Sequence, residues 1–531
     1  MQFRSGAKPV AMALSKAVAI SAALAGAVWA HDEEPGEGKG SLTSGGGGSP
    51  PGTIFPSFNI DQLGRIPKDD LIDPNAPGSE RGSDIWGWTD PLTDAEYALV
   101  GLTDGTAFVD ISDPVNPVNL GRLPTQTFSS AWRDIKTYNN HAYIVADNAG
   151  LHGMQIFDLT KLRGLTGPPI VFTEDGHYST FDKAHNININ ENTGHLYAVG
   201  TDEDSGGLHI LDLTNPTNPV EVGAFPDDGY THDVQVVTYT GPDALHQGKE
   251  VAFAFNVDTL TIVDVTNKNL PVQLSKTGYS ASGYVHQVWL TEDHAYLLHD
   301  DELDERNNPA INFTRTHVWD MADLDNPAYI GFHEHTVASI DHNLYTHNNL
   351  AFESNYTTGV RVLDITDVAN SSADPNGHID EISTVAWIDT HPSKDSLTSF
   401  DGAWSVYPYF DSGAIVIGDR EEGLVIVQLN ILDGDTESDR DVDLTDLQVV
   451  ADHWMTSVDA GFMEGDFDLN DLVNQADLDL IEANWLVGTG QSTPTFDEAL
   501  NLVGLPEPST LWLLALAGAA SLRRRRRQDG T

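Results

Sequence analysis

The amino-acid sequence predicts a mainly β protein, a seven-bladed β-propeller followed by a small α-helical domain. Two internal repeats lead to this prediction. A short β-rich run recurs seven times between residues 84 and 430, and an acidic segment repeats at an interval of 31 residues between 433 and 488. The chain has 531 residues, 40% of them apolar, so it is long enough for several domains at ~150 residues each.

Each of the seven runs ends in Asp, or in Gln at the last run, and most are followed by turn residues. The runs cover residues 107–110, 155–158, 209–212, 261–264, 317–320, 361–364 and 425–428. A spacing near 50 residues, filled with short strands, is typical of four-stranded propeller blades. In the second blade we expect strands at 134–138, 142–146, 154–158 and 170–173. Seven units can bury their faces in a closed ring, which favours a propeller over an open β-solenoid.

The amino-acid sequences of the runs resemble a known repeat family. The last run contains Leu424, Val425, Ile426 and Val427, and such runs resemble LVIVD repeats. The whole region of residues 84–430 resembles the choice-of-anchor B family of secreted bacterial proteins. The stretches that carry this resemblance are 184–187, 231–234, 300–305, 341–345 and 402–405. The resemblance implies a propeller fold and an exported location, and it implies no particular reaction.

The N-terminal segment has the features of an export signal. Residues 1–30 combine the basic residues Arg4 and Lys8, an apolar stretch and small residues near Ala30, as in a secretory signal peptide. The alternative is an uncleaved anchor. A Gly/Ser/Pro-rich segment follows, and we interpret residues 31–83 as a flexible linker.

The C-terminal tail has three parts in a fixed order. Pro506, Glu507 and Pro508 precede an apolar stretch at 511–522 and five arginines at 523–527. Twelve apolar residues form a helix of about 18 Å, too short to cross ~30 Å of hydrocarbon. The tail, residues 505–531, resembles the PEP-CTERM sorting signal of Gram-negative envelope proteins. This implies cleavage by an exosortase, transient membrane anchoring, and a final place in the cell envelope, on the outer surface or in the extracellular matrix.

Composition excludes several classes of protein. With 80 Asp and Glu against 27 Lys and Arg, the formal charge is −53, which excludes general binding to nucleic acid. The absence of cysteine excludes disulfides, thiolate metal sites and thiol catalysis.

One position in the first strand of each repeat is His or Trp. These residues are Trp86, Trp132, His185, His232, His286, His342 and Trp404. If this strand is the innermost of each blade, the side chains recur around the central channel. Neutral imidazole binds zinc, copper, iron or nickel, so His185, His232, His286 and His342 form a candidate transition-metal site. The alternative is that each His hydrogen-bonds the backbone of a neighbouring blade.

A second acidic feature lies inside the repeats. Residues 300–305 include five Asp and Glu side chains. Carboxylates are the ligands that Ca²⁺ prefers, so this loop is a candidate calcium site. The alternative is a solvated acidic turn.

Two loops between residues 433 and 488 have the spacing of calcium ligands. Positions 1, 3, 5, 7, 9 and 12 are Asp435, Glu437, Asp439, Asp441, Asp443 and Asp446 in the first loop, and Asp466, Asp468, Asn470, Leu472, Asn474 and Asp477 in the second. Such a loop directs about six oxygens at one cation, with the position 7 residue contributing its carbonyl. An apolar pattern typical of a helix follows each loop. The apolar residues are Leu447, Val450 and Trp454, then Leu478, Ile481 and Trp485.

The duplicated loop–helix unit resembles a type I dockerin repeat. The resemblance implies bound Ca²⁺ and a cohesin-like receptor as partner, and a calcium-folded spacer is the alternative. Arg440 and Asp471 occupy position 6, where Gly normally permits the sharp turn. We therefore expect the first loop to bind Ca²⁺ more weakly than its number of carboxylates suggests. Residues 489–504 are interpreted as a second linker.

These features predict an exported envelope or matrix protein whose propeller binds a protein or polysaccharide. Two alternatives remain: a metal-dependent, hydrolase-type enzyme that uses the histidine cluster, and a structural biofilm scaffold. The sequence contains no Gly-x-Ser-x-Gly elbow, phosphate-binding loop or dinucleotide fingerprint, so no catalytic residue is assigned. A non-enzymatic function is therefore expected.

Overall fold

The structure is a computed structural model that describes residues 52–505 except 77, 281, 437–440, 459–464 and 468–471. The predicted signal peptide, the first part of the predicted linker and nearly all of the sorting tail lie outside the described residues. So do four of the predicted calcium ligands, namely Glu437, Asp439, Asp468 and Asn470.

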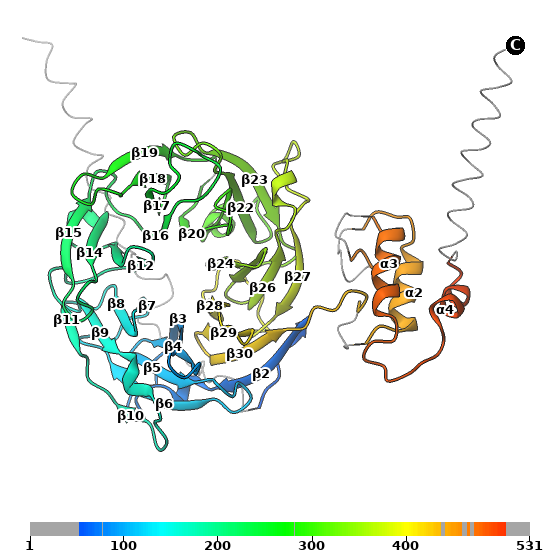
Figure 1. The fold of residues 1–531 in the computed structure, drawn as a ribbon, viewed down its shortest axis with the longest axis horizontal. Coiled ribbons are helices and arrows are strands. Elements are labelled where there is room, and N and C mark those ends of the chain that lie inside the picture. Colours follow the sequence, from blue (N-terminus) through cyan, green and yellow to red (C-terminus); the bar gives the residue numbers. More distant parts are fainter. Residues whose placement is uncertain are drawn as a thin grey trace, which may run out of the picture. The chain divides into compact units, whose positions relative to one another are not determined.

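Seven sheets, built almost entirely of antiparallel strands, form a ring, which confirms the predicted seven-bladed propeller (Figure 1). The innermost strands contact one another in chain order, and the last contacts the first. They are β3 (Gly82–Thr89), β7 (Arg133–Tyr138), β12 (Asn186–Asn190), β16 (Asp233–Thr238), β20 (Val285–Leu290), β24 (Asn343–His347) and β28 (Ala403–Tyr407). The second strands are β4 (Glu96–Leu102), β8 (His141–Ala146), β13 (His195–Val199), β17 (Glu250–Phe255), β21 (Tyr296–Asp301), β25 (Leu350–Ser354) and β29 (Ala414–Asp419).

The seven repeated runs form the third strand of each blade. These strands are β5 (Gly105–Asp110), β9 (Met154–Asp158), β14 (Leu208–Asp212), β18 (Leu260–Asp264), β22 (Arg315–Asp320), β26 (Val360–Asp364) and β30 (Gly423–Leu429). In the first six, the final Asp accepts a hydrogen bond of 2.6–3.0 Å from the backbone N–H two residues later. The side chain therefore starts the turn that ends the strand, which explains the repeated acidic residue.

The outer strands show how the ring closes. They are β6 (Val118–Pro124), β11 (Gly176–Tyr178), β15 (Val220–Phe225), β19 (Val272–Thr277), β23 (Ala328–Glu334), β27 (Ser383–Ile388) and β2 (Ile60–Ile66). Strand β2 precedes the first blade in the chain but pairs antiparallel with β30 of the last blade. The short β1 (Ser57–Phe58) likewise pairs with β27 of the sixth blade. The first and last parts of the propeller are thus joined by hydrogen bonds.

The predicted linker over residues 31–83 is therefore wrong in its second half. Ile60 and Ile66 are 5% and 8% exposed because β2 is a structural strand of the seventh blade. Composition did not reveal this strand, since its middle residues are mostly polar or small and are only half-buried.

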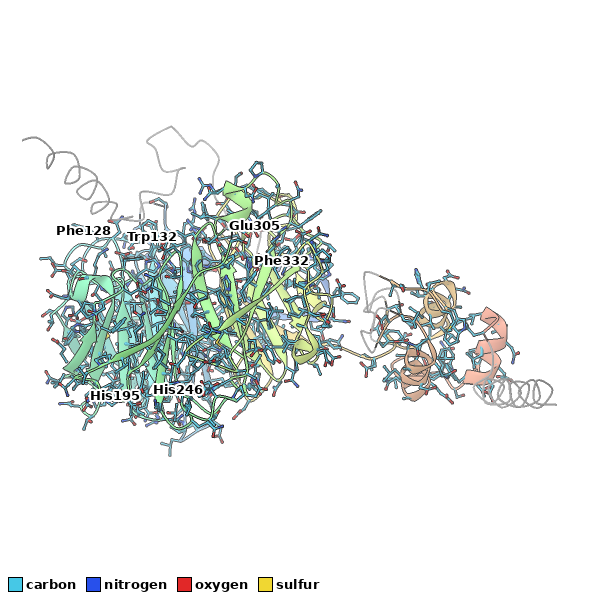
Figure 2. All side chains as sticks on the ribbon, turned by 90° about the horizontal axis from the view of Figure 1, so that it is seen from above. Phe128, Trp132, His195, His246, Glu305 and Phe332 are labelled. Carbon is cyan, nitrogen blue, oxygen red and sulfur yellow. The ribbon has the colours of Figure 1, made fainter. Side chains whose placement is uncertain are left out.

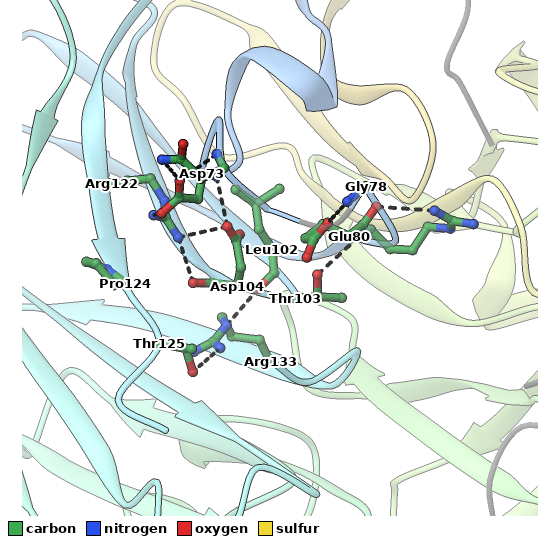
Figure 3. A network of polar contacts seen from close by, with 12 residues as sticks. Asp73, Gly78, Glu80, Leu102, Thr103, Asp104, Arg122, Pro124, Thr125 and Arg133 are labelled. Carbon is green, nitrogen blue, oxygen red and sulfur yellow. Dashed lines mark hydrogen bonds and ion pairs between the residues drawn. The ribbon is translucent and has the colours of Figure 1, made fainter. Parts of the chain in front are cut away.

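Buried arginines reinforce the start of the propeller (Figure 3). Arg122 donates hydrogen bonds to Asp104 Oδ2 at 2.8 Å and to Asp73 Oδ2 at 3.1 Å. Arg133 donates from Nε to the carbonyl of Leu102 at 2.9 Å, and burial lowers its pKa to about 10. The segment around Asp73, also predicted as linker, is thereby attached to the first blade.

One predicted strand belongs to a different blade. Within residues 170–173, only β10 (Ile170–Val171) is a strand, and it pairs in parallel with β6 of the first blade. Both of its side chains are exposed, so they contribute nothing to the core of the second blade. The outer strand of that blade is β11, which pairs antiparallel with β9.

The described C-terminal residues form three helices, α2 (Leu444–Asp452), α3 (Gln475–Asn484) and α4 (Phe496–Val503). Each begins with a reciprocal capping box, in which the N-cap side chain and an acidic side chain three residues later bond each other's backbone N–H. The helices predicted after the acidic loops end just before Trp454 and Trp485. The linker predicted over 489–504 instead contains α4. Short segments within the propeller are α1 (Asp304–Asn307) and the 3-10 turns Lys68–Asp70, Leu159–Leu162, Asp204–Gly206 and Val368–Asn370.

None of the helices in the described part of the chain is long and apolar enough to cross a membrane.

Candidate functional site

Four imidazoles lie side by side near one end of the channel. The ring centroids of His185 and His232 are 4.1 Å apart, those of His232 and His286 are 4.2 Å apart, and those of His286 and His342 are 4.4 Å apart. We call this group of four residues the histidine mouth. It adjoins a cavity of ≈ 30 Å³ that all four side chains line. The sequence-based grouping of these four histidines is therefore correct in space.

Two of the three predicted tryptophan members of the ring, Trp86 and Trp132, need correction, whereas Trp404 lies at the ring position as predicted. The hydroxyl of Ser83 donates to the carbonyl of Arg133, which places these two residues at the ring position of the first and second blades. Trp86 instead packs against Tyr345 and Tyr407, with ring centroids 5.6 and 5.1 Å away. The β-bulge between Gly82 and Ile85 contains Ser83, just as the bulges of β20 and β28 contain His286 and Trp404. Sequence spacing alone therefore misplaced the member of the first blade by three residues.

The ring residues link neighbouring blades through their backbones. Nδ1 of His232, His286 and His342 lies 3.1, 3.0 and 2.6 Å from the carbonyl oxygen of the next ring residue. Because a carbonyl oxygen only accepts, Nδ1 is the donor in each case. In His185, Nδ1 instead lies 3.1 Å from Asp147 Oδ2. The alternative expected for these histidines was a hydrogen bond to the backbone of a neighbouring blade. Three of the four, His232, His286 and His342, form such a bond.

A carboxylate that the sequence did not assign to this group lies beside the histidine mouth. Glu302 Oε2 is 4.0 Å from Nε2 of His286, and Glu302 Oε1 is 3.8 Å from Nε2 of His342. The hydroxyl of Tyr356 donates to Glu302 Oε1 at 2.8 Å. The side chains of His286, His342 and Glu302, which come from two neighbouring blades, therefore converge. The other two histidines of the histidine mouth, His185 and His232, are not part of this convergence.

The acidic loop at 300–305 is buried, so its interpretation as a solvated turn is wrong. Its five carboxylates are each at most 5% exposed: Asp300, Asp301, Glu302, Asp304 and Glu305. Burial and then Asp341 raise the pKa of Asp300 well above its usual value. Burial, together with the neighbouring carboxylates, likewise raises the pKa of Glu305. The fifth blade thus encloses a strongly electronegative region.

A second acidic group lies deeper in the channel. Lys136 Nζ is 2.6 Å from Asp134 Oδ1 and 3.9 Å from Asp84 Oδ2. Asp84 also accepts the backbone N–H of Ile135 at 3.0 Å, which joins the first two blades. Burial raises the pKa of Asp84 to about 8, with Lys136 opposing the rise and Asp134 adding to it.

We expect the free energy of unfolding to fall as the pH rises from about 4 to about 8. The pKa of the Asp84 carboxyl is 3.8 when the group is solvated and about 8 in the folded chain. Between these values the folded chain binds more protons than the unfolded chain, so raising the pH favours unfolding by at most about 1.4 kcal/mol per pH unit. Asp84→Asn should flatten this slope in urea unfolding, because its amide oxygen can still accept from Ile135. Exposed Asp94→Asn is the control, and an equal slope in both variants would contradict the assignment.

The other end of the channel has an aromatic and amide lining. A cavity of ≈ 250 Å³ there is lined by half-buried Trp86 and Trp289, by Lys136, and by Asn188 and Gln235. We call this cavity the tryptophan mouth. Its lining includes residues 188–192, which lead to His195, and Figure 2 places His195 near the face opposite to Trp132 and Glu305.

The amides of the tryptophan mouth have a defined orientation. Asn188 Oδ1 accepts the backbone N–H of Val236 at 2.9 Å, and Gln235 Oε1 accepts that of Leu290 at 2.8 Å. Each bond fixes the oxygen toward the next blade and leaves the NH₂ group as a donor for the cavity. Sequence spacing does not reveal this site, because its residues come from several blades that are far apart in the chain.

The two acidic loops of the C-terminal region repeat their contacts 31 residues apart. Asp446 accepts the N–H of Thr436 at 2.7 Å and of Asp443 at 2.8 Å. Asp477 accepts the equivalent N–H groups of Phe467 and Asn474 at the same distances. In the first loop, carboxylate oxygens of Asp441, Asp443 and Asp446 all lie within 4.8 Å of one another.

Comparisons with known proteins identify two segments. The LVIVD repeat matches residues 196–227, which contain most of the third blade, and the PEP-CTERM protein-sorting motif matches residues 505–527. No curated protein matches the chain. The chain is similar to hydrazine synthase of Kuenenia stuttgartiensis, with 13% identity and a TM-score of 0.45 over 62% of this chain and 92% of that one. It is also similar to the computationally designed Ika8 protein, with 11% identity and a TM-score of 0.37 over 65% of this chain and 82% of that one.

The sorting motif indicates an exported protein of the Gram-negative cell envelope that an exosortase processes at the tail. The LVIVD match and the seven sheets agree on the propeller.

Proposed function

We propose that this protein is a non-enzymatic envelope protein of the choice-of-anchor B type, whose propeller binds a neutral polysaccharide at the tryptophan mouth. The observation that carries the proposal is the lining of that cavity by two indole rings and by amides whose NH₂ groups are available as donors. A sugar has an apolar C–H face and a hydroxyl edge. Indole rings contact the first, and amide NH₂ groups bond the second.

Charge restricts the polysaccharide to a neutral one. The chain has a formal charge of −53, which repels acidic polymers. The one cationic side chain of the lining, Lys136, is already bonded to Asp134 and lies 4.4 Å from the ring centroid of Trp86. It is therefore not available as a binding site for a carboxylate or sulfate group.

The C-terminal region is proposed to bind calcium as a dockerin-like module. Support comes from the matching contacts of Asp446 and Asp477 and from the clustered oxygens of the first loop. Such a module would attach the exported chain to a cohesin-like receptor or to another envelope component. Exosortase processing would separate the exported chain from its sorting tail.

Trp289→Ala is expected to weaken binding of a neutral polysaccharide by about tenfold or more, because it removes one indole face of the cavity. The measurement is calorimetric titration of the exported chain with soluble neutral oligosaccharides, after a screen on a glycan array. Trp132→Ala is the matched control, since Trp132 lies at the opposite face (Figure 2). A loss of affinity in Trp132→Ala with none in Trp289→Ala would place the ligand at the other end of the channel. Saturable hydrolysis of the polymer would contradict a purely binding function.

A further inference from the structure

The convergence of His286, His342 and Glu302 has the dimensions of a metal centre. The Nε2 and carboxylate atoms of these three residues all lie within 4.8 Å of one another, and each residue is at most 5% exposed. A metal ion with bonds of about 2.0–2.1 Å needs its donor atoms roughly 3.3 Å apart in tetrahedral geometry. The separations of 3.8 and 4.0 Å therefore need to shorten by only about half an ångström.

The hydrogen bonds on the far side of each imidazole provide a second observation. Nδ1–H of His286 and of His342 donates to a backbone carbonyl, so in the neutral ring the lone pair is on Nε2. Both lone pairs then face the Glu302 carboxylate across about 4 Å, an arrangement that is repulsive without a positive charge between them. Histidines that bind metals usually have this pattern, with the other ring nitrogen donating to a carbonyl or carboxylate.

The surroundings favour a cation. Asp300, Asp304 and Asp341 are 1–2% exposed, and none of them forms an ion pair with Lys or Arg in the described residues. Both oxygens of Asp300, Oδ1 of Asp304 and Oδ1 of Asp341 have no hydrogen-bond partner within that part of the chain. Buried carboxylates without a compensating charge are costly, and a nearby divalent cation reduces this cost.

We propose that His286, His342 and Glu302 bind one divalent first-row transition-metal ion at the histidine mouth. Two imidazole nitrogens and one carboxylate suit Zn²⁺ or Fe²⁺, whereas Ca²⁺ prefers oxygen ligands only. The hydrogen bond from Tyr356 orients the carboxylate. The adjacent cavity of ≈ 30 Å³ is lined by both histidines and has room for one or two water molecules as further ligands.

The test is metal binding by the exported chain in excess Ca²⁺, so that the acidic loops of the C-terminal region are occupied. After treatment with a chelator and return to Ca²⁺, Zn²⁺ is titrated by calorimetry, and the bound metal is counted by elemental analysis. We expect one Zn²⁺ per chain. We expect Glu302→Gln to weaken Zn²⁺ binding by at least about 100-fold, because the carboxylate charge is lost while the shape is kept.

Two further variants keep the experiment decisive. His209→Asn removes a buried histidine that bonds Asp204 and Tyr178 away from the centre, and it should retain one Zn²⁺. His342→Asn should lose it, and Co²⁺ bound to the native chain should give a visible spectrum that is absent in this variant. If Glu302→Gln fails to fold, the rise in Tm of the native chain on adding Zn²⁺ in excess Ca²⁺ still reports the site.

Three results would overturn the proposal. The first is a native chain that binds no transition metal in excess Ca²⁺. The second is equal Zn²⁺ affinity in the native chain and in Glu302→Gln. The third is loss of the metal in Asp304→Asn or Asp341→Asn while Glu302→Gln retains it, which would place the ion among the carboxylates.

Discussion

A chain that begins at residue 68 is expected to lose the folded propeller at temperatures where the full chain is stable. This truncation removes β2, which forms the outer edge of the seventh blade by pairing with β30. It exposes β30 as an unpaired edge and removes the buried side chains of Ile60 and Ile66, each contributing about 1.5–3 kcal/mol. The ion pair between Arg65 and Glu422 is lost as well. Thermal unfolding followed by circular dichroism measures the effect.

The control is a chain that begins at residue 52, which keeps β2 and should unfold like the full chain. Gly64→Val tests the same strand without truncation. A Cβ at Gly64 would lie 2.2 Å from the carbonyl oxygen of Pro114, so the substitution must displace β2. If the chain from residue 68 melts at the same temperature as the chain from residue 52, β2 does not close the ring in solution.

Removal of Ca²⁺ is expected to unfold the C-terminal helical region while the propeller remains folded. The oxygens of Asp441, Asp443 and Asp446 are held within 4.8 Å of one another and repel each other without a cation. At 100 times the dissociation constant, each occupied loop adds about 2.7 kcal/mol to stability, which is a large share for a small domain. Addition of EDTA should decrease the helical signal and shift the fluorescence of Trp454 and Trp485 to the red.

The double variant Asp435→Ala with Asp466→Ala should show the unfolded spectrum even in Ca²⁺, since it removes the first ligand of both loops. Asp497→Ala, in the first turn of α4 and outside the loops, should remain folded in Ca²⁺ and respond to EDTA like the native chain. An EDTA-resistant helical signal in the native chain would show that the acidic loops fold without calcium.

The internal repeats in the sequence made the propeller predictable. Six of the seven blades have a buried third strand that ends in an Asp such as Asp212, and that Asp starts a turn by a local hydrogen bond. The 31-residue repeat of the acidic loops and the tail at 505–527 depend equally on residues close together in the chain. Local spacing carries all of this information, so the sequence by itself determined the blade number, the acidic loops and the sorting signal.

Only the tertiary structure decided which residues meet across the ring. Strand β2 pairs with β30 more than 350 residues later, and Tyr356 orients Glu302 from another blade. Ser83 rather than Trp86 occupies the ring position of the first blade, where its hydroxyl donates to the carbonyl of Arg133. Pairing between distant strands, and the side chain that each blade places in the ring, depend on packing between blades, and no periodicity in the sequence encodes them. The tryptophan mouth and the centre formed by His286, His342 and Glu302 therefore emerged only from the folded chain.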